Sequence, residues 1–285
     1  MKSKVIAFCV MAAFLCAVTG TTHGAIFGPG TFVETLTSDI GTWDRIDWVP
    51  GSLTDENDTS PPDGLPDSVQ FTNDGLRATE LYIGGILHLE LDNVPTDAGV
   101  RVDANMFQGV FNSNLREWGL QTGVYFNENN WIYLARGRDA GGGWFSIRKV
   151  DGAAPDIIDH GFVGFFDGWH MQGIELTETE INFYASPAGV DTFSGGRTDF
   201  DGQMTLDLSG MTIARPASFT GDATVLVGRG YAYANGDPGD ANWDFVNPKS
   251  ITIAATRVTV LPEPATAMLL ISGVLVGWRP RRRAA

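Results

Sequence analysis

Residues 118–126 read Trp118-Gly119-Leu120-Gln121-Thr122-Gly123-Val124-Tyr125-Phe126, and residues 130–136 read Asn130-Trp131-Ile132-Tyr133-Leu134-Ala135-Arg136. In the first stretch, every second residue belongs to an apolar stripe, which is the two-residue period of a strand with one buried face. The segment 127–129, Asn-Glu-Asn, is typical of a turn. We therefore predict an antiparallel hairpin, followed by a third strand at 143–150 beyond a glycine-rich loop.

The rest of the chain shows the same short alternating runs. We expect further strands at 32–36, 69–72, 86–91, 100–107, 169–177, 180–185, 203–208, 223–232 and 250–260. A dozen or so short strands separated by clusters of Gly, Asp, Asn and Pro predict an all-β chain, with an antiparallel two-sheet β-sandwich over residues 25–260. No repeat of 20–50 residues is visible, which disfavours a propeller or a solenoid.

Composition limits the class of protein. The chain has 285 residues, of which 43% are hydrophobic and 19% charged, and this excludes a disordered or fibrous protein. No apolar run is long enough for a polytopic membrane protein. The 35 glycines favour a turn-rich β architecture. The net charge of −15 argues against a nucleic-acid partner, because binding phosphates requires a surplus of Lys and Arg.

Residues 1–24 have the order of features of a secretory signal peptide. Two lysines precede an apolar run over 5–18, and small residues lead to a predicted cleavage site after Gly24, with Gly20 as the second choice. A buried N-terminal helix is the alternative. Both cysteines of the chain lie in this segment, so we expect the exported protein to have neither a disulfide nor a thiolate metal site.

Residues 261–285 form a second distinct segment. Pro262-Glu263-Pro264 is expected to stay extended, because proline fixes φ and has no N–H to donate. The apolar stretch 265–278 would rise only about 21 Å as a helix, against a hydrocarbon core of about 30 Å, although arginine side chains can snorkel. We predict a short apolar helix that stops transfer, with its basic end held in the cytoplasm by Arg279, Arg281, Arg282 and Arg283.

This order of motifs resembles the PEP-CTERM sorting domain of bacterial surface proteins. The resemblance implies export by the Sec machinery and processing by an exosortase, a membrane protease, near Pro262-Glu263-Pro264. It also implies transient anchoring in the inner membrane by the C-terminus and delivery to the cell surface or the extracellular matrix. Pro280 and Trp278 depart from the family pattern. A plain C-terminal membrane anchor without processing is the alternative.

Residues 100–184 resemble the concanavalin A-like, or laminin G-like, jelly roll. The residues that carry the resemblance are the two stretches quoted above, followed by Trp144-Phe145-Ser146-Ile147, then Trp169 and residues 181–184. The family includes lectins, polysaccharide-binding modules, adhesion domains and glycanases. The resemblance therefore implies a fold and leaves several functions open.

Glycanases of this family use closely spaced carboxylates from a Glu-x-Asp-x-Glu strand, about 5 Å apart in retaining enzymes. The nearest match is Glu90-Leu91-Asp92, with Val94 and Pro95 where the last glutamate would stand. Because the motif is incomplete, we predict that the protein is not an enzyme. The histidines of the predicted domain are not spaced as metal ligands: His88, His160 and His170.

Polar residues on two predicted strands indicate a glycan-binding face. Arg101, Asp103 and Asn105 alternate with apolar residues, and Gln121 and Tyr125 lie opposite the apolar stripe of their strand. Polar groups can hydrogen-bond sugar hydroxyls while aromatic rings stack on pyranose faces. We predict that these five residues bind glycan. A solvated outer face is the alternative, because one wet face is normal for an antiparallel sheet.

Four aspartates in one Pro/Gly-rich loop indicate a calcium site. Asp55, Asp58, Asp63 and Asp67 lie within 13 residues, and oxygen ligands on a tight glycine-containing loop suit Ca²⁺. The alternative is a solvated loop that carries solubilising charge. No other cofactor is predicted.

We therefore expect an exported β-sandwich that is sorted to the surface or matrix and binds glycan or extracellular matrix without catalysis. Extracellular polysaccharide is the expected partner of the folded domain. Two alternatives stay open: a purely structural surface or biofilm protein with no small ligand, and a diverged glycan hydrolase.

Overall fold

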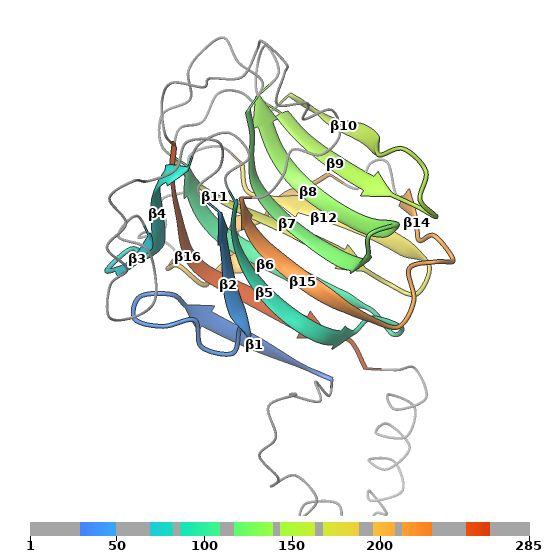
Figure 1. Ribbon diagram of the computed structural model, residues 1–285, viewed down its shortest axis with the longest axis horizontal. Helices are drawn as coiled ribbons and strands as arrows, with labels where there is room; N and C mark the ends of the chain where they lie inside the picture. The colour runs from blue at the N-terminus through green and yellow to red at the C-terminus, as the bar shows by residue number, and fades with distance from the viewer. Residues whose placement is uncertain are drawn as a thin grey trace, which may run out of the picture.

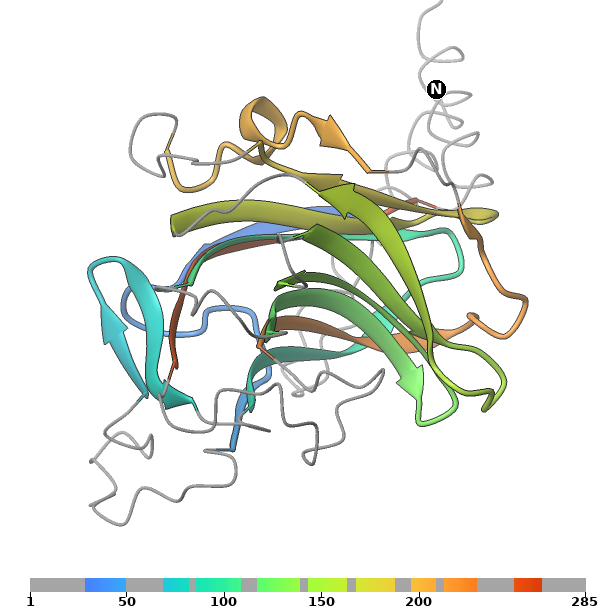
Figure 2. The same ribbon diagram turned by 90° about the horizontal axis from the view of Figure 1, so that it is seen from above.

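The computed structural model describes residues 29–49, 69–81, 86–108, 117–138, 143–162, 168–187, 196–208, 213–229 and 249–262. Two antiparallel β-sheets pack face to face as a sandwich, as Figures 1 and 2 show. Within these ranges there is one short helix, α2 (Phe200–Gln203). The prediction of an all-β, two-sheet sandwich is confirmed, whereas the helix was not predicted.

The first sheet, sheet A, contains nine strands in the described residues. Its order is β13 (Leu206–Asp207), β12 (Glu180–Ala185), β11 (Gly168–Leu176), β6 (Val100–Gln108), β16 (Lys249–Val260), β4 (Gly75–Leu81) and β3 (Val69–Thr72). Two short additions complete it: β1 (Gly30–Thr35) pairs with β16, and β14 (Ile213–Ala214) pairs with β12.

The second sheet, sheet B, contains seven strands in the same part of the chain. Its order is β10 (Asp156–Phe162), β9 (Gly143–Lys149), β8 (Asn130–Arg138), β7 (Glu117–Asn127), β15 (Asp222–Arg229), β5 (Ile86–Pro95) and β2 (Arg45–Val49). The predicted hairpin is β7 and β8, which pair with Val124 opposite Ile132, and the predicted third strand is β9.

The core lies between the two sheets and follows from the strand alternation. On β6, for example, Val102, Ala104 and Met106 point inward and are fully buried. Leu89 and Leu91 do the same on β5 from the opposite sheet. Burying one such aliphatic side chain contributes about 1.5–3 kcal/mol. The alternation also decides which side chains remain on the two outer faces, where a ligand can bind.

One polar side chain ties the sheets together across this core. Gln172 of β11 is fully buried. Its amide nitrogen, Nε2, donates to the carbonyl of Leu134 at 3.1 Å and to Oγ1 of Thr122 at 3.0 Å. A buried amide needs such partners, because an unpaired one costs free energy. The bonds therefore fix the position of β11 relative to β7 and β8.

A guanidinium group closes one end of the sandwich. Arg215 donates at 2.8 Å to the carbonyl oxygens of Thr96, Thr177 and Phe219, which belong to three different loops. Burial lowers the pKa of Arg215, with Asp97 and Glu178 acting in the opposite direction. The carbonyl of Thr96 also accepts from the backbone N–H of Gly99 at 2.9 Å, so Arg215 adds a second bond there and ties the three loops together.

The described chain begins and ends at the same place. Gly30 of β1 lies opposite Val260 of β16, so the segments that carry the predicted export and sorting signals adjoin neighbouring strands of sheet A. Leu261 continues this arrangement by donating its backbone N–H to the carbonyl of Gly99 at 3.0 Å.

Candidate functional site

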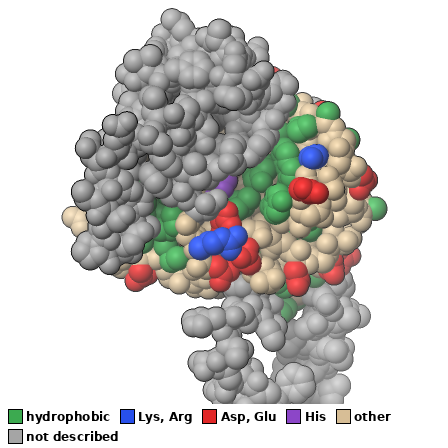
Figure 3. Space-filling model, viewed as in Figure 1, with side chains coloured by type: hydrophobic (Ala, Val, Ile, Leu, Met, Phe, Trp, Pro, Cys, Tyr) green, Lys and Arg blue, Asp and Glu red, His purple; other side chains and the backbone are tan. Residues whose placement is uncertain are grey.

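The outer face of sheet B carries a cluster of aromatic and apolar side chains that is separate from the core. Trp131 and Tyr133 of β8 point outward, with ring centroids 5.1 Å apart and planes at 45°. Leu226 of β15 and Tyr125 of β7 pack against them. Figure 3 shows apolar side chains beside a group of charged ones on the side of the molecule where sheet B lies.

Gly123 makes the position of Tyr133 possible. Gly123 of β7 lies opposite Tyr133 of β8, and a Cβ atom at Gly123 would lie 2.1 Å from Cδ1 of Tyr133. The tyrosine ring therefore lies across the glycine backbone. Burial, and to a smaller extent the charges of Tyr125 and Glu90, raises the pKa of the Tyr133 hydroxyl. The phenol stays neutral and can donate a hydrogen bond.

Two carboxylates lie on the same outer face, on β5. Glu90 and Asp92 alternate with the buried Leu89 and Leu91. Arg45 of β2 lies opposite Glu90 and forms ion pairs with both carboxylates through different guanidinium nitrogens. The side chain of Glu90 is 12% exposed, that of Asp92 31% and that of Arg45 49%. Glu90 is thus deeply set, whereas Asp92 and Arg45 open toward solvent.

Asp92 is held in its ionised form. Oγ1 of Thr224, on β15, donates to Oδ1 of Asp92 at 2.7 Å. Burial acts against ionisation, but hydrogen bonds from Arg45 and Thr224 outweigh it, so the pKa of Asp92 lies below its ordinary value. A carboxylate that keeps its charge in this way can serve as a base or a nucleophile.

His88 extends the polar row two residues before Glu90. Its ring is buried, which lowers the pKa of His88 to about 4 and keeps the imidazole neutral. In the described part of the chain, Nε2 of His88 has no hydrogen-bond partner. Gln121 lies in the same cross-strand row, with only Gly228 between the two side chains. This nitrogen is itself buried, so it lies beneath the surface of the outer face.

The structure separates the five residues predicted to bind glycan. Gln121 and Tyr125 lie on the outer face of sheet B, as part of the site described here. Arg101, Asp103 and Asn105 lie on β6 in sheet A, and their side chains point to the opposite side of the sandwich. The expectation of one shared binding face is wrong, because β6 and β7 follow each other in sequence but belong to different sheets.

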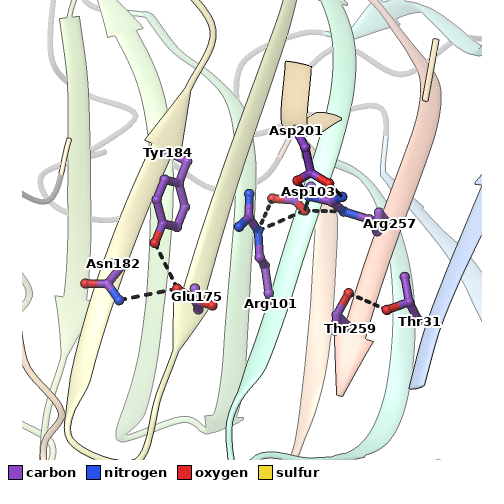
Figure 4. A network of polar contacts seen from close by, with 9 residues as sticks. All are labelled: Thr31, Arg101, Asp103, Glu175, Asn182, Tyr184, Asp201, Arg257 and Thr259. Atoms are coloured by element: carbon purple, nitrogen blue, oxygen red, sulfur yellow. Dashed lines mark hydrogen bonds and ion pairs between the residues drawn. The ribbon is translucent and has the colours of Figure 1, made fainter. Parts of the chain in front are cut away.

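On sheet A, Asp103 and Arg101 are engaged with other protein groups (Figure 4). Asp103 is fully buried and accepts from Nε of Arg101 at 3.0 Å and from Nε of Arg257 at 2.7 Å. Burial raises the pKa of Asp103 against the opposing effect of both arginines. Arg257 also pairs with Asp201 of α2 at 2.8 Å, and Arg101 lies 4.4 Å from the ring centroid of Tyr184. This network ties α2 to the sheet.

The other predicted sites lie largely outside the described residues. The four predicted calcium ligands, Asp55, Asp58, Asp63 and Asp67, are outside them, as are the signal peptide and the segment from residue 263 onward. Of the sorting motif, only Pro262 is described, and it is exposed. In the described ranges, no group of three or more His, Cys, Asp or Glu side chains could hold a metal ion. No helix there is long and apolar enough to span a bilayer.

Sequence reasoning missed most of the residues in this site. The sequence pattern assigns Trp131 and Tyr133 only to a strand, and the incomplete Glu-x-Asp-x-Glu motif gives no reason to select Glu90 and Asp92. The alternation of Trp131 and Tyr133 with Ile132 was the available signal, because it places both rings on the face opposite the core.

Comparisons with known proteins find similarity at the level of the fold. No protein-family model and no curated protein matches the chain. Among solved structures, a pseudo β-1,3-glucanase and immunostimulatory antigen of Mycobacterium tuberculosis is 12% identical with a TM-score of 0.45, over 82% of this chain and 99% of that one. A transglycosylase in complex with NAG is 11% identical with a TM-score of 0.44, over 80% and 83% of the two chains.

A third similar structure comes from work on endo-acting O-glycanases of the human gut microbiota, and it is 12% identical with a TM-score of 0.44, over 81% and 98% of the two chains. The expectation that the protein is not an enzyme is corrected, because the structures to which the chain is similar include a pseudo β-1,3-glucanase, a transglycosylase and a protein from work on O-glycanases. At these identities the similarity describes the fold, and the chemistry has to be argued from the site.

Proposed function

We propose that the domain recognises an extracellular glycan on the outer face of sheet B and hydrolyses it there, with Glu90 and Asp92 as the carboxylate pair. The observation that carries the proposal is that an aromatic platform and two carboxylates share this face. The rings of Trp131 and Tyr133 are each 7% exposed and pack together on this face, and Glu90 lies opposite Leu226, which belongs to the same cluster.

The two carboxylates differ in the way that glycoside hydrolysis requires. One group has to protonate the leaving oxygen, and the other has to act as a base or nucleophile. Asp92 is the more exposed, and the hydrogen bond from Thr224 favours its charged form without Arg45, so we assign it the second role. Glu90 is more buried and next to the aromatic rings, so we assign it the role of acid.

Arg45 has to leave for this chemistry to occur, because it occupies both carboxylates in the absence of ligand. Its side chain is 49% exposed, so solvent can take up the guanidinium when it moves. A bound sugar that hydrogen-bonds to the carboxylates can then replace Arg45 as their partner.

A panel of soluble β-glucans, chitin fragments and mucin-type glycans tests the proposal, with binding and release of reducing ends measured for each. Glu90→Gln and Asp92→Asn should retain binding but reduce release by at least a hundredfold. Trp131→Ala should weaken binding about tenfold. Glu175→Gln is the matched control, because it makes the same atomic change on the outer face of sheet A, where Glu175 accepts from Tyr184 at 2.9 Å.

Unchanged release in both Glu90→Gln and Asp92→Asn would refute the assignment of the carboxylates. Binding by the wild-type protein without any release would remove the hydrolytic step. If no glycan in the panel bound to the wild-type protein, or if Trp131→Ala left binding unchanged, the proposed site itself would be wrong.

We also propose that the protein is exported and sorted to the cell surface or matrix through an exosortase. The support comes from the sequence: the order of charged, apolar and small residues in 1–24, and Pro262-Glu263-Pro264 followed by an apolar stretch and four arginines. The pairing of Gly30 with Val260 is compatible with removal of both segments, since the cuts would fall beyond the strands.

A further inference from the structure

A hollow of about 260 Å³ lies on the other side of the sandwich, on the outer face of sheet A. The described residues that line it are Thr72, Asp74, Arg77, Phe107, Trp169 and Thr252. Its volume is below the roughly 300 Å³ at which pockets for drug-sized ligands begin, so it suits a smaller group such as one sugar residue. Because the hollow belongs to sheet A, it is separate from the carboxylates of sheet B.

Four of the lining residues form a straight row across neighbouring strands. Trp169 of β11 lies opposite Phe107 of β6, Phe107 opposite Thr252 of β16, and Thr252 opposite Arg77 of β4. Strands lie about 4.8 Å apart, so the backbones of β11 and β4 are about 14 Å apart along this row, and the side chains of Trp169 and Arg77 both line the hollow between them. It offers two rings at one end, a hydroxyl in the middle and a cation at the other end.

The walls of the hollow are held in place by contacts within the protein. The rings of Phe107 and Trp169 have centroids 5.2 Å apart, with planes inclined at 54°. On another side, Arg197 pairs with Asp74 at 3.2 Å and so bridges the β3–β4 turn to the segment that precedes α2. Asn105 fixes that segment by donating to the carbonyl of Arg197 at 3.1 Å. A preformed site loses less entropy when it binds.

Arg77 is the charged group that this arrangement leaves available. Asp74, the acid in the lining, is already paired with Arg197. Arg77 is exposed, and no hydrogen bond or ion pair of its side chain is found among the described residues. A guanidinium has a planar set of donors that matches a carboxylate through two parallel hydrogen bonds.

We propose that this hollow binds a single carboxylated sugar residue, such as a uronate, with its ring against Trp169 and its carboxylate on Arg77. The hydroxyl of Thr252, midway along the row, can bond to a ring hydroxyl. A single acidic sugar fits this site better than a long anionic polysaccharide, because the net charge of the chain is −15 and its surface repels extended anions. The site does not depend on the function proposed for sheet B.

Galacturonic acid methyl glycoside and its methyl ester are the probes, because they differ only in the charge of the carboxyl group. Binding to the full chain is followed by ligand-observed and protein-observed NMR at matched ionic strength. The acid should bind at least tenfold more tightly than the ester, as expected when a carboxylate gains a charge-assisted pair. Arg77→Gln should remove this preference, whereas Trp169→Leu should weaken both probes at least tenfold.

Glu90→Gln is the control for the other face, and it should leave binding of both probes unchanged. Arg77 is exposed, so Arg77→Gln is expected to fold normally, and its melting temperature checks this. Equal affinity of the wild-type protein for acid and ester, an unchanged preference in Arg77→Gln, or loss of acid binding in Glu90→Gln would overturn the proposal. Since Arg77 takes no part in the sheet B site, failure here leaves the proposed hydrolysis to be judged separately.

Discussion

Replacing Gly123 with alanine tests the geometry of the outer face of sheet B. In an ordinary strand this change would stabilise the protein by about 0.4–1 kcal/mol, because alanine has less conformational freedom to lose on folding. The structure predicts the opposite sign. The new Cβ would lie 2.1 Å from Cδ1 of Tyr133 and 2.7 Å from the carbonyl oxygen of Ile132. Both distances are far inside van der Waals contact.

The magnitude follows from what has to move. Tyr133 is packed against Trp131 and Leu226, so its ring cannot turn away without disturbing the cluster. Overpacking of this kind costs about 1–3 kcal/mol, which corresponds to a fall in melting temperature of roughly 2–12 °C for a domain of this size. A displaced Tyr133 also changes the platform beside Glu90, so we expect glycan binding to weaken together with stability.

Urea unfolding of the wild-type protein, Gly123→Ala, Tyr133→Ala and the double variant measures the effect as a double-mutant cycle. If the tyrosine ring is the obstacle, Gly123→Ala should cost less in the Tyr133→Ala background than in the wild type, by about 1 kcal/mol or more. A Gly123→Ala variant that is as stable as the wild type would show that the ring does not lie over Gly123. The site as described would then be incorrect.

Three further predictions concern the ends, the pH response and the sorting of the protein. Arg215→Met should lower the free energy of unfolding by about 2–4 kcal/mol, because loop carbonyls lose their donor, whereas Arg148→Met, which removes an exposed ion pair, should cost less than about 1 kcal/mol. Because burial lowers the pKa of His88 from 6.5 to about 4, the unfolded chain binds more protons between these values, so stability should fall as pH drops through this window, and His88→Gln should flatten that slope in urea titrations. Alanines in place of Pro262-Glu263-Pro264 should leave export intact but block maturation, and an immunoblot with the same shortened product as the wild type would count against the processing assignment.

The local alternation of apolar and polar residues was enough to predict a two-sheet sandwich, but it did not show which strands belong to which sheet. Residues 118–136 have a strict two-residue period and a clear turn, and they form the hairpin of β7 and β8 as predicted. The strands that we did not predict, β2, β4, β10 and β14, are short or broken by polar residues, so their period is weak. These strands form because they pair with a longer neighbouring strand, as β2 does with β5. Such pairing depends on the tertiary structure, so the local sequence does not predict it.

The position of the predicted glycan-binding residues depends on long-range strand pairing even more than the fold does. Strand alternation correctly placed Gln121 and Tyr125 away from the core, and it placed Arg101 and Asp103 away from the core too. It could not show that these pairs lie on opposite sides of the molecule, because β6 joins its sheet through β11 and β16, and β7 pairs with β15, all of which are distant in the sequence. Arg257, which pairs with Asp103, is 154 residues distant. Local sequence cannot reveal such a partner.

The two outer faces differ in how much of their polar surface remains available to a ligand. On sheet A, the centre is closed by α2 and by the pairs of Asp103 with Arg101 and Arg257, and the hollow at Arg77 lies to one side of this network. On sheet B, Arg45 pairs with both carboxylates but is half exposed and can be displaced, and Thr224 donates to Asp92. The paired ends at Gly30 and Val260 belong to sheet A. A protein attached to a membrane or matrix through its C-terminus would therefore be held by the sheet that does not carry the proposed hydrolytic site, which leaves the carboxylates of sheet B free to meet a polymeric glycan.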